Sequence, residues 1–242
     1  MSDSVFSDWR TKSYPFEFQG RLTVGILVGG TPSDPNVAKG WLESKIKGAG
    51  DDRIQTLIAQ TMVERNITAD EALEVVNNLK NLSGFKKDPE RGLFIEGRQL
   101  KAALKEAVSV AVAAGKLDMT KWGATRKWLT NYFPEHVFVL DERLYLGVME
   151  PSGVLQNFVH THKTSAIQYQ EYVNKAEISF TVVTDHPFTE EQWAMIWTTG
   201  EQNGLGAGRS QGYGTYNVTQ WDKKVNEAAA KRLAKKSKDD DE

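Results

Sequence analysis

Alternating apolar positions predict several strands along this chain. The first such run, residues 20–30, places four apolar side chains on one face: Leu22, Val24, Ile26 and Val28. This period of two is typical of a strand with one buried face. Shorter runs of the same kind predict further extended segments at 92–95, 136–140, 143–149, 177–183 and 215–221.

Helical periodicity appears between these runs. Apolar residues recur at helical spacing over 52–65, over the stretch after Thr68 and over 98–114, where Gly115 is placed to end the helix. Thr68 and Glu71 form a capping box that predicts a helix start. Thr189 and Gln192 form a second one, before a helix that ends near 200–204.

The order of these elements predicts an α+β fold, with helices packed on one face of an antiparallel sheet. We expect one domain over 1–222, with a mostly helical insertion at about 44–90, because so short a segment can hold little core of its own. Residues 150–176 are polar and aromatic, and residues 223–242 form a charged tail that we expect to be frayed.

Composition narrows the environment and the chemistry. The 242 residues include no cysteine, which excludes disulfides and thiolate metal sites and is compatible with the reducing cytoplasm, where we expect the protein to act. The first residues carry charges and do not resemble a secretory signal. No apolar run approaches the roughly 18 residues of a membrane span, so we expect no membrane partner.

The charge is unevenly distributed although the net charge is only −2. Residues 51–90 carry eight acidic and five basic side chains, whereas residues 91–131 carry eight basic and three acidic ones. A basic segment on a nearly neutral protein can form a local face for phosphate. The alternative is that these lysines and arginines only solvate helix surfaces.

The segment GLGAGRSQGYG, residues 204–214, has five glycines in eleven positions. Glycine lets a ligand approach the backbone closely, and exposed amides in such a loop can hold phosphate oxygens. Arg209 could pair with phosphate in a bidentate way, and Ser210 adds a hydroxyl. The segment matches neither the Walker A pattern nor the dinucleotide fingerprint, because it has Arg in place of Lys and follows a helix rather than a strand. A purely structural turn, with Tyr213 and Tyr216 in the core, remains an alternative.

Three segments together resemble the RAMP superfamily of CRISPR-associated proteins. The Gly-rich loop between a helix and a last strand resembles the superfamily's C-terminal signature. RGLFIEGRQLKAALKEA, residues 91–107, is similar to its "yIPGSSLKGalR" segment, with Ala102 in place of a usual glycine and Arg98-Gln99 in place of two serines. The opening strand over 20–30 is similar to its first strand. The most similar members look like backbone subunits of type III CRISPR effectors.

The resemblance implies a ferredoxin-like, modified RNA-recognition core, and binding to single-stranded guide RNA without a required cofactor. It implies partners as well, either other effector subunits or copies of this chain in a head-to-tail filament. The segment at 150–176 sits where the superfamily has a thumb. The RNA-binding residues so implied are Gly204, Gly206, Gly208, Arg209, Ser210, Gly212, Arg98, Lys101, Lys105 and Lys163.

An endoribonuclease is the second hypothesis. The resemblance implies that Asp34, in the loop after the first strand, could cleave RNA with Mg²⁺ as the metal. The alternative for Asp34 is a cap on the turn before Pro35. His160 and His162 lie two apart, on one face if the segment is a strand, and could act as acid and base. Surface or base-stacking roles are the alternative for both, whereas His136 and His186 look structural.

A third hypothesis belongs to a different class. The chain could be a structural or adaptor protein of a virus or mobile element that kept the fold and lost the RNA. Salt-dependent affinity for RNA separates this hypothesis from the first two.

Overall fold

The computed structural model describes residues 13–32, 51–80, 82–117, 132–160, 165–227 and 229–231. Four antiparallel strands form its centre, in the spatial order β10 (Tyr216–Val225), β1 (Phe16–Val28), β9 (Ser165–Thr184) and β6 (Val137–Val139). Helix α5 (Gly97–Ala113) lies between β1 and β6 in the sequence, and α7 (Glu190–Asn203) lies between β9 and β10.

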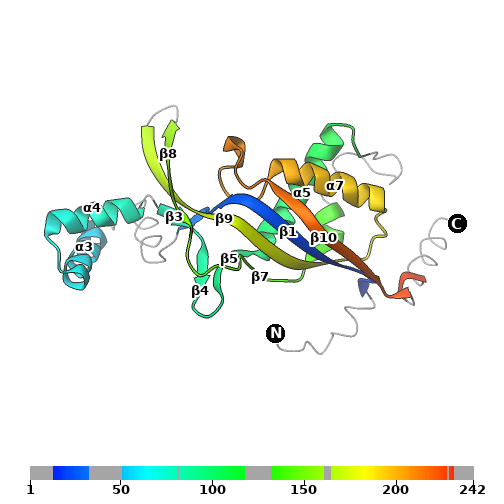
Figure 1. Cartoon of the computed structure of the whole chain (residues 1–242), viewed down its shortest axis with the longest axis horizontal. Coiled ribbons are helices and arrows are strands. Elements are labelled where there is room, and N and C mark those ends of the chain that lie inside the picture. The colour runs from blue at the N-terminus through cyan, green and yellow to red at the C-terminus, as the bar shows by residue number, and fades with distance from the viewer. Residues whose placement is uncertain are drawn as a thin grey trace.

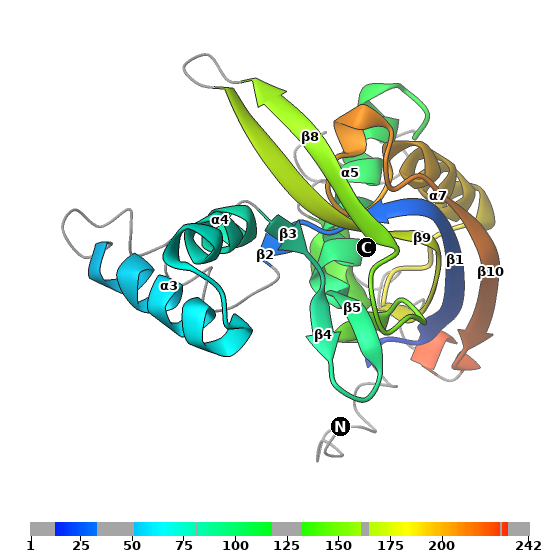
Figure 2. The same cartoon turned by 60° about the vertical axis from the view of Figure 1, so that its left-hand side comes forward.

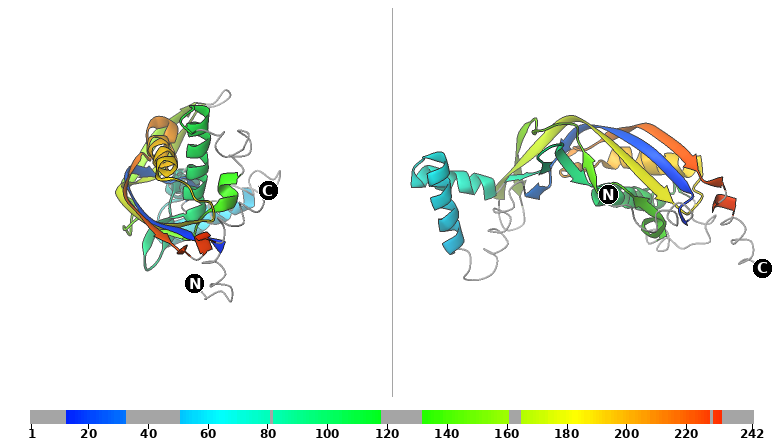
Figure 3. Two further views of the ribbon diagram at one scale, coloured as in Figure 1. Left: turned by 90° about the vertical axis from the view of Figure 1, so that its right-hand side faces the viewer. Right: turned by 90° about the horizontal axis from the view of Figure 1, so that it is seen from below.

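The chain order of this core is strand, helix, strand, strand, helix, strand. Its fourth, first, third and second strands are neighbours in that order, which is the ferredoxin-like arrangement. Both helices cover the same face of the sheet (Figure 1; Figure 3). The predicted α+β fold, with helices on one face of an antiparallel sheet, is therefore confirmed.

Alternation along β1 explains why that face is covered. Every second residue from Phe16 to Val24 is buried, and the residues between them are partly or fully exposed. The buried positions pair with buried positions of β9, such as Leu22 with Ile178. Helix α5 buries one stripe against them: Leu100, Leu104, Ala107, Val108 and Ala111.

Aromatic side chains fill the core between α7 and the sheet. The Phe18 ring stacks on Trp221 with centroids 4.6 Å apart, and Trp221 lies 5.0 Å from both Trp193 and Trp197. Phe180 adjoins Trp197 at 5.6 Å and lies flat over Gly20, where a Cβ atom would be 2.3 Å from the ring. Position 20 therefore requires glycine, because any side chain there would overlap the Phe180 ring.

The opposite face of the sheet is polar. On β1 it presents Glu17, Gln19, Arg21 and Thr23, which pair with Val183, Thr181, Ser179 and Glu177 of β9. The β10 partners of these residues are Lys224, Asp222, Gln220 and Asn217. Over these twelve positions the open face carries no aromatic side chain.

The helical insertion projects from the sheet (Figure 2). Helices α3 (Asp51–Arg65) and α4 (Ala69–Lys80) pack on each other around Ile58 and Ala72. The predicted capping box is present, since the Thr68 amide donates to Glu71 Oε2 at 2.8 Å and the Glu71 amide donates to Thr68 Oγ1. A second capping box, Thr189 with Gln192, begins α7 as predicted.

The last residues of the insertion predicted at about 44–90 are not helical. Two short strands form there, β3 (Leu82–Gly84) and β4 (Lys86–Asp88). β3 joins β2 (Thr31–Pro32) and runs parallel to β9, whereas β4 joins β5 (Gly92–Glu96), which also pairs with β7 (Arg143–Tyr145). β3 and β4 have only three residues each, which are too few for alternation to reveal them.

The segment at 150–176 is a β-hairpin. β8 (Gly153–His160) pairs with the first half of β9, and β9 continues from this hairpin into the central sheet. Figure 2 shows the hairpin extending beyond the sheet. Lys175, with φ 55°, lies where the pairing of β9 with β1 skips one position, between Asn174 and Ala176. Within the described ranges no helix is both long and apolar enough to cross a bilayer.

Gly20→Ala tests the aromatic packing. We expect the free energy of unfolding in urea to fall by about 1–3 kcal/mol, because the buried Phe180 ring has no room to move away from a methyl group. Gly25→Ala is the matched control on the same strand, since the nearest atom to its Cβ would be 3.8 Å away. We expect that variant to be neutral or stabilised by up to about 1 kcal/mol. Equal effects at the two sites would contradict this account of the core.

Candidate functional site

The Gly-rich loop folds back onto the end of β1. The Ala207 amide donates to the Val28 carbonyl at 3.0 Å, and the Gly214 amide donates to the Ile26 carbonyl at 2.8 Å. The Leu205 amide in turn donates to the Gly214 carbonyl at 2.8 Å, which closes the loop on itself. Hydrogen bonds therefore fix the loop to the end of β1, next to the start of β10.

Packing explains part of the glycine content. Gly204, Gly206, Gly208, Gly212 and Gly214 all have positive φ. At Gly214 a Cβ atom would lie 1.9 Å from the Leu205 carbonyl oxygen, so no other residue fits there. At Gly212 a Cβ atom would meet nothing within 4 Å, and only the backbone conformation favours glycine. The structural explanation therefore accounts for a large share of the motif.

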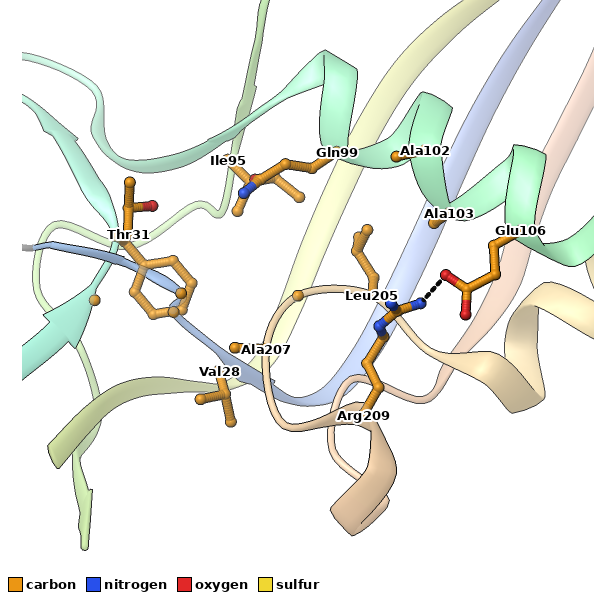
Figure 4. Close-up of a pocket in the computed structure, with 15 residues that line it drawn as sticks. Val28, Thr31, Ile95, Gln99, Ala102, Ala103, Glu106, Leu205, Ala207 and Arg209 are labelled. Carbon is orange, nitrogen blue, oxygen red and sulfur yellow. Dashed lines mark hydrogen bonds and ion pairs between the residues drawn. The ribbon is translucent and has the colours of Figure 1, made fainter. Parts of the chain in front are cut away.

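A cleft of about 360 Å³ lies beside this loop (Figure 4). Its walls come from four segments: residues 28–31 at the end of β1, residues 84–85, residues 95–106 at the end of β5 and along α5, and loop residues 205–209. Gly29 and Gly84 meet backbone to backbone, because a Cβ atom on Gly29 would be 2.3 Å from the Gly84 carbonyl carbon. Glu171 holds this corner by accepting a hydrogen bond from the Phe85 amide at 3.1 Å, and burial raises the pKa of its carboxyl.

Arg209 reaches from the loop to α5 across the rim of the cleft. Its Nη1 donates to Glu106 Oε2 at 2.6 Å, as drawn in Figure 4. The two side chains remain 34% and 46% exposed, so this ion pair contributes only about 0–1 kcal/mol. The guanidinium has further N–H groups that can donate to a ligand.

Gln99 lines the same cleft from the first turn of α5. Its side-chain Oε1 accepts a hydrogen bond from the Glu96 amide at 3.2 Å, which completes a capping box at the start of the helix. Because this bond fixes which end of the amide faces the backbone, Nε2 is the end left to donate. The prediction that this helix begins at about residue 98 is confirmed, but its capping box was missed, because Glu is an uncommon N-cap residue.

The three basic residues of α5 predicted to bind RNA do not line the cleft. Arg98 pairs with Glu96, whereas Lys101 places its ammonium 4.1 Å from the centre of the Phe138 ring. Burial lowers the pKa of Lys101. Helical spacing puts Arg98, Lys101 and Lys105 in one stripe, next to the side of α5 that lines the cleft with Gln99, Ala102, Ala103 and Glu106. The structure thus brings Arg209 to the cleft and places the three α5 residues next to it.

Several predicted residues lie outside the described part of the chain. Asp34, His162 and Lys163 fall in its gaps, and for His160 only the backbone, at the end of β8, is described. Their proposed roles in cleavage, metal binding and RNA binding stay predictions. Ser210 lies exposed at the turn Arg209–Gln211, beside Gly208 and Gly212.

A cluster of titratable side chains that sequence reasoning missed lies at the far end of the sheet. His136 Nδ1 is 2.7 Å from Asp185 Oδ1, and the Tyr132 ring stacks on His136 with centroids 3.7 Å apart. The Tyr132 hydroxyl is 3.0 Å from His186 Nδ1. The spacing of Tyr132 and His136 was a local signal, since residues four apart share a helix face. No local signal indicated that Tyr132 and His136 contact Asp185 and His186, because these contacts depend on the pairing of β6 with β9.

Comparisons with known proteins give a similarity in structure only. No protein-family model matches the sequence, and no curated protein matches it. Solved structures do match. One similar chain belongs to the cryo-EM structure of the type III-B Cmr-beta bound to cognate target RNA. That chain is 12% identical, with a TM-score of 0.46, over 90% of this chain and 64% of its own length. The present chain therefore spans less than two thirds of that relative.

Substitutions in the Gly-rich loop separate its two kinds of glycine. We expect Gly212→Ala to lower the free energy of unfolding by about 1–2 kcal/mol, which is the cost of a left-handed backbone at a residue with a Cβ atom. Gly214→Ala should cost more, because the methyl group would also overlap the Leu205 carbonyl. Urea denaturation of the two variants measures the difference. The reverse order would contradict the packing described for this loop.

The histidine cluster predicts a dependence of stability on pH. Burial, together with the nearby His136, lowers the pKa of His186 to about 4, below its ordinary value of 6.5. Between these values the unfolded chain binds a proton that the folded protein rejects. The stabilisation is therefore present above pH 6.5 and is lost as the pH falls toward 4. In urea titrations at several pH values, His186→Gln should reduce this slope; an unchanged slope would contradict the assignment to His186.

Proposed function

We propose that this protein binds single-stranded RNA in the cleft between the Gly-rich loop and α5. The observation that carries the proposal is the construction of the cleft: Gly29, Gly84 and Gly206 bring bare backbone to its walls, and Arg209 stands at its rim with partly exposed donors. In the described part of the chain the Gly206 amide makes no hydrogen bond, which leaves it able to donate to a ligand.

The open face of the sheet is a poor alternative site. RNA-recognition domains of the usual kind stack bases on aromatic residues of that face. Here the corresponding positions of β1, β9 and β10 are polar, charged or, at Val183, aliphatic. Base stacking supplies about 1–3 kcal/mol per base to single-strand binding. The positions of β1, β9 and β10 lack this contribution, and the aromatic residue that β6 adds beside Val183, Phe138, packs against Tyr14. This favours the end of the sheet where the cleft lies.

Charge supports the same location. Arg209 at the rim and the stripe of Arg98, Lys101 and Lys105 lie on adjoining surfaces of the loop and α5. A strand of RNA leaving the cleft along α5 would pass these side chains, and neutralising phosphates releases counterions and so increases affinity. The acidic insertion of α3 and α4 lies beyond β2 and β3, at the end of these two strands that is away from the cleft (Figure 1).

The proposal extends to the kind of assembly. From the resemblance of its loop we propose a backbone-type subunit of a CRISPR-effector-like ribonucleoprotein, in which the RNA is a guide. Other effector subunits, or further copies of this chain placed head to tail, would lie along the same strand. The hairpin of β8 and β9 would serve as the thumb, and the role of Lys163 in RNA binding stays part of the proposal. Cleavage through Asp34 with Mg²⁺, or through His160 and His162, stays a separate prediction.

Fluorescence anisotropy with single-stranded RNA, single-stranded DNA and duplex DNA, each over a salt series, tests the proposal. We expect selective binding to single-stranded RNA that weakens as salt rises. Arg209→Ala should weaken it several-fold, because a charged hydrogen-bond donor to the RNA is lost.

Arg21→Ala is the matched control for that variant. It removes the same charge from the open face of the sheet, where Arg21 is exposed. Loss of binding with Arg21→Ala but not with Arg209→Ala would transfer the site to the sheet. Absence of binding to any RNA would overturn the proposed function.

A further inference from the structure

The side chains that line the cleft are mostly apolar, which suits a flat and largely apolar ligand group. Phe85, Ile95, Ala103 and Leu205 are buried and line it together with Ala102. At about 360 Å³ it lies at the lower end of the size range of small-molecule pockets, which are mostly apolar with a few polar groups placed to orient the ligand. This volume suits a nucleoside better than an extended polymer backbone.

Three polar side chains are distributed along one side of this cleft. Gln99 and Glu106 are seven residues apart on α5, about 10 Å along the helix axis. Gln99 has its oxygen bound to the Glu96 amide and Nε2 left to donate. Glu106 and Arg209 form the ion pair at the other end. The cleft therefore offers hydrogen-bonding groups at both ends of a space about as long as a nucleoside.

Glu106 argues against a phosphate inside the cleft. A carboxylate only accepts hydrogen bonds and repels another anion, so the interior favours a neutral group that donates hydrogen bonds. Arg209 is held next to this carboxylate and can donate to an acceptor on the same ligand edge. Oε2 of Glu106 already accepts from Arg209 Nη1, but a carboxylate oxygen can accept more than one hydrogen bond, so the pair can offer a ligand two acceptor oxygens and, next to them, a guanidinium donor.

Among the RNA bases, guanine has the complementary edge. Its Watson–Crick side carries two neighbouring donors, N2–H and N1–H, followed by the acceptor O6. Adenine presents one donor beside an acceptor nitrogen there, and uracil presents one donor between two acceptors. Proteins that read single-stranded RNA hydrogen-bond the exposed edges of unstacked bases in this manner.

We propose that the cleft holds one unstacked guanine of the bound RNA, and that Glu106 is the residue that selects it. The carboxylate of Glu106 accepts from N1 and N2, Arg209 donates to O6, and the apolar walls contact the faces of the base. This inference rests on the proposed function, since it names the base that the same cleft takes.

A short oligouridylate with a single central guanine, hypoxanthine or adenine, presented to the wild-type protein in anisotropy titrations, tests the inference. We expect the guanine strand to bind about tenfold more tightly than the adenine strand, as one good bidentate base contact provides. Hypoxanthine lacks the N2 amino group and should fall between them. Glu106→Gln should make the affinities for the guanine and adenine strands equal. This expectation holds even if the loss of the negative charge changes the affinity for all strands.

Glu177→Gln is the control, because it removes an exposed carboxylate from the open face of the sheet and should leave the ratio unchanged. Equal affinity of the wild-type protein for guanine and adenine strands would overturn the inference and leave RNA binding intact. A ratio that survives Glu106→Gln would overturn the role of Glu106. If none of the strands binds, the proposed function fails together with the inference.

Discussion

The pairing of β1 along both of its edges is the constraint on which the other features depend. β9 takes one edge and β10 the other, although the three strands are far apart in the sequence. The same strand supplies the core with its buried alternate residues and supplies the Gly-rich loop with the carbonyl groups of Ile26 and Val28. A shift of one residue in this register would turn the apolar side of β1 outward and would also move the loop relative to α5.

Short-range patterns predicted the framework of the fold. Alternation over 20–30, the helical period over 98–114 and the capping boxes at Thr68 and Thr189 are all patterns that a short run of consecutive residues contains. These segments were found because each has enough length, or a sufficiently specific cap, for its periodicity to stand out.

Segments shaped by distant contacts were not predicted. β3 and β4 are three residues long and exist because β9, β2 and β5 provide hydrogen-bond partners. In the hairpin of β8 and β9 the one buried side chain among residues 168–172 is the polar Gln170, so hydrophobic alternation did not reveal it. Likewise, the sequence indicated Arg209 as a candidate ligand residue, but its partner Glu106 lies 103 positions away, and only the packing of the loop on α5 brings the two together.

The cleft is composed of segments from the beginning, the middle and the end of the chain, and this has a thermodynamic consequence. The unfolded chain cannot contain the cleft, so whatever occupies it binds the native state alone. Each bound ligand then shifts the folding equilibrium by mass action, by about 2.7 kcal/mol when its concentration is a hundred times its dissociation constant. Because the loop and the end of β1 share hydrogen bonds, we expect this gain to extend into the central sheet, so that occupancy of the cleft and melting temperature of the domain are linked quantities.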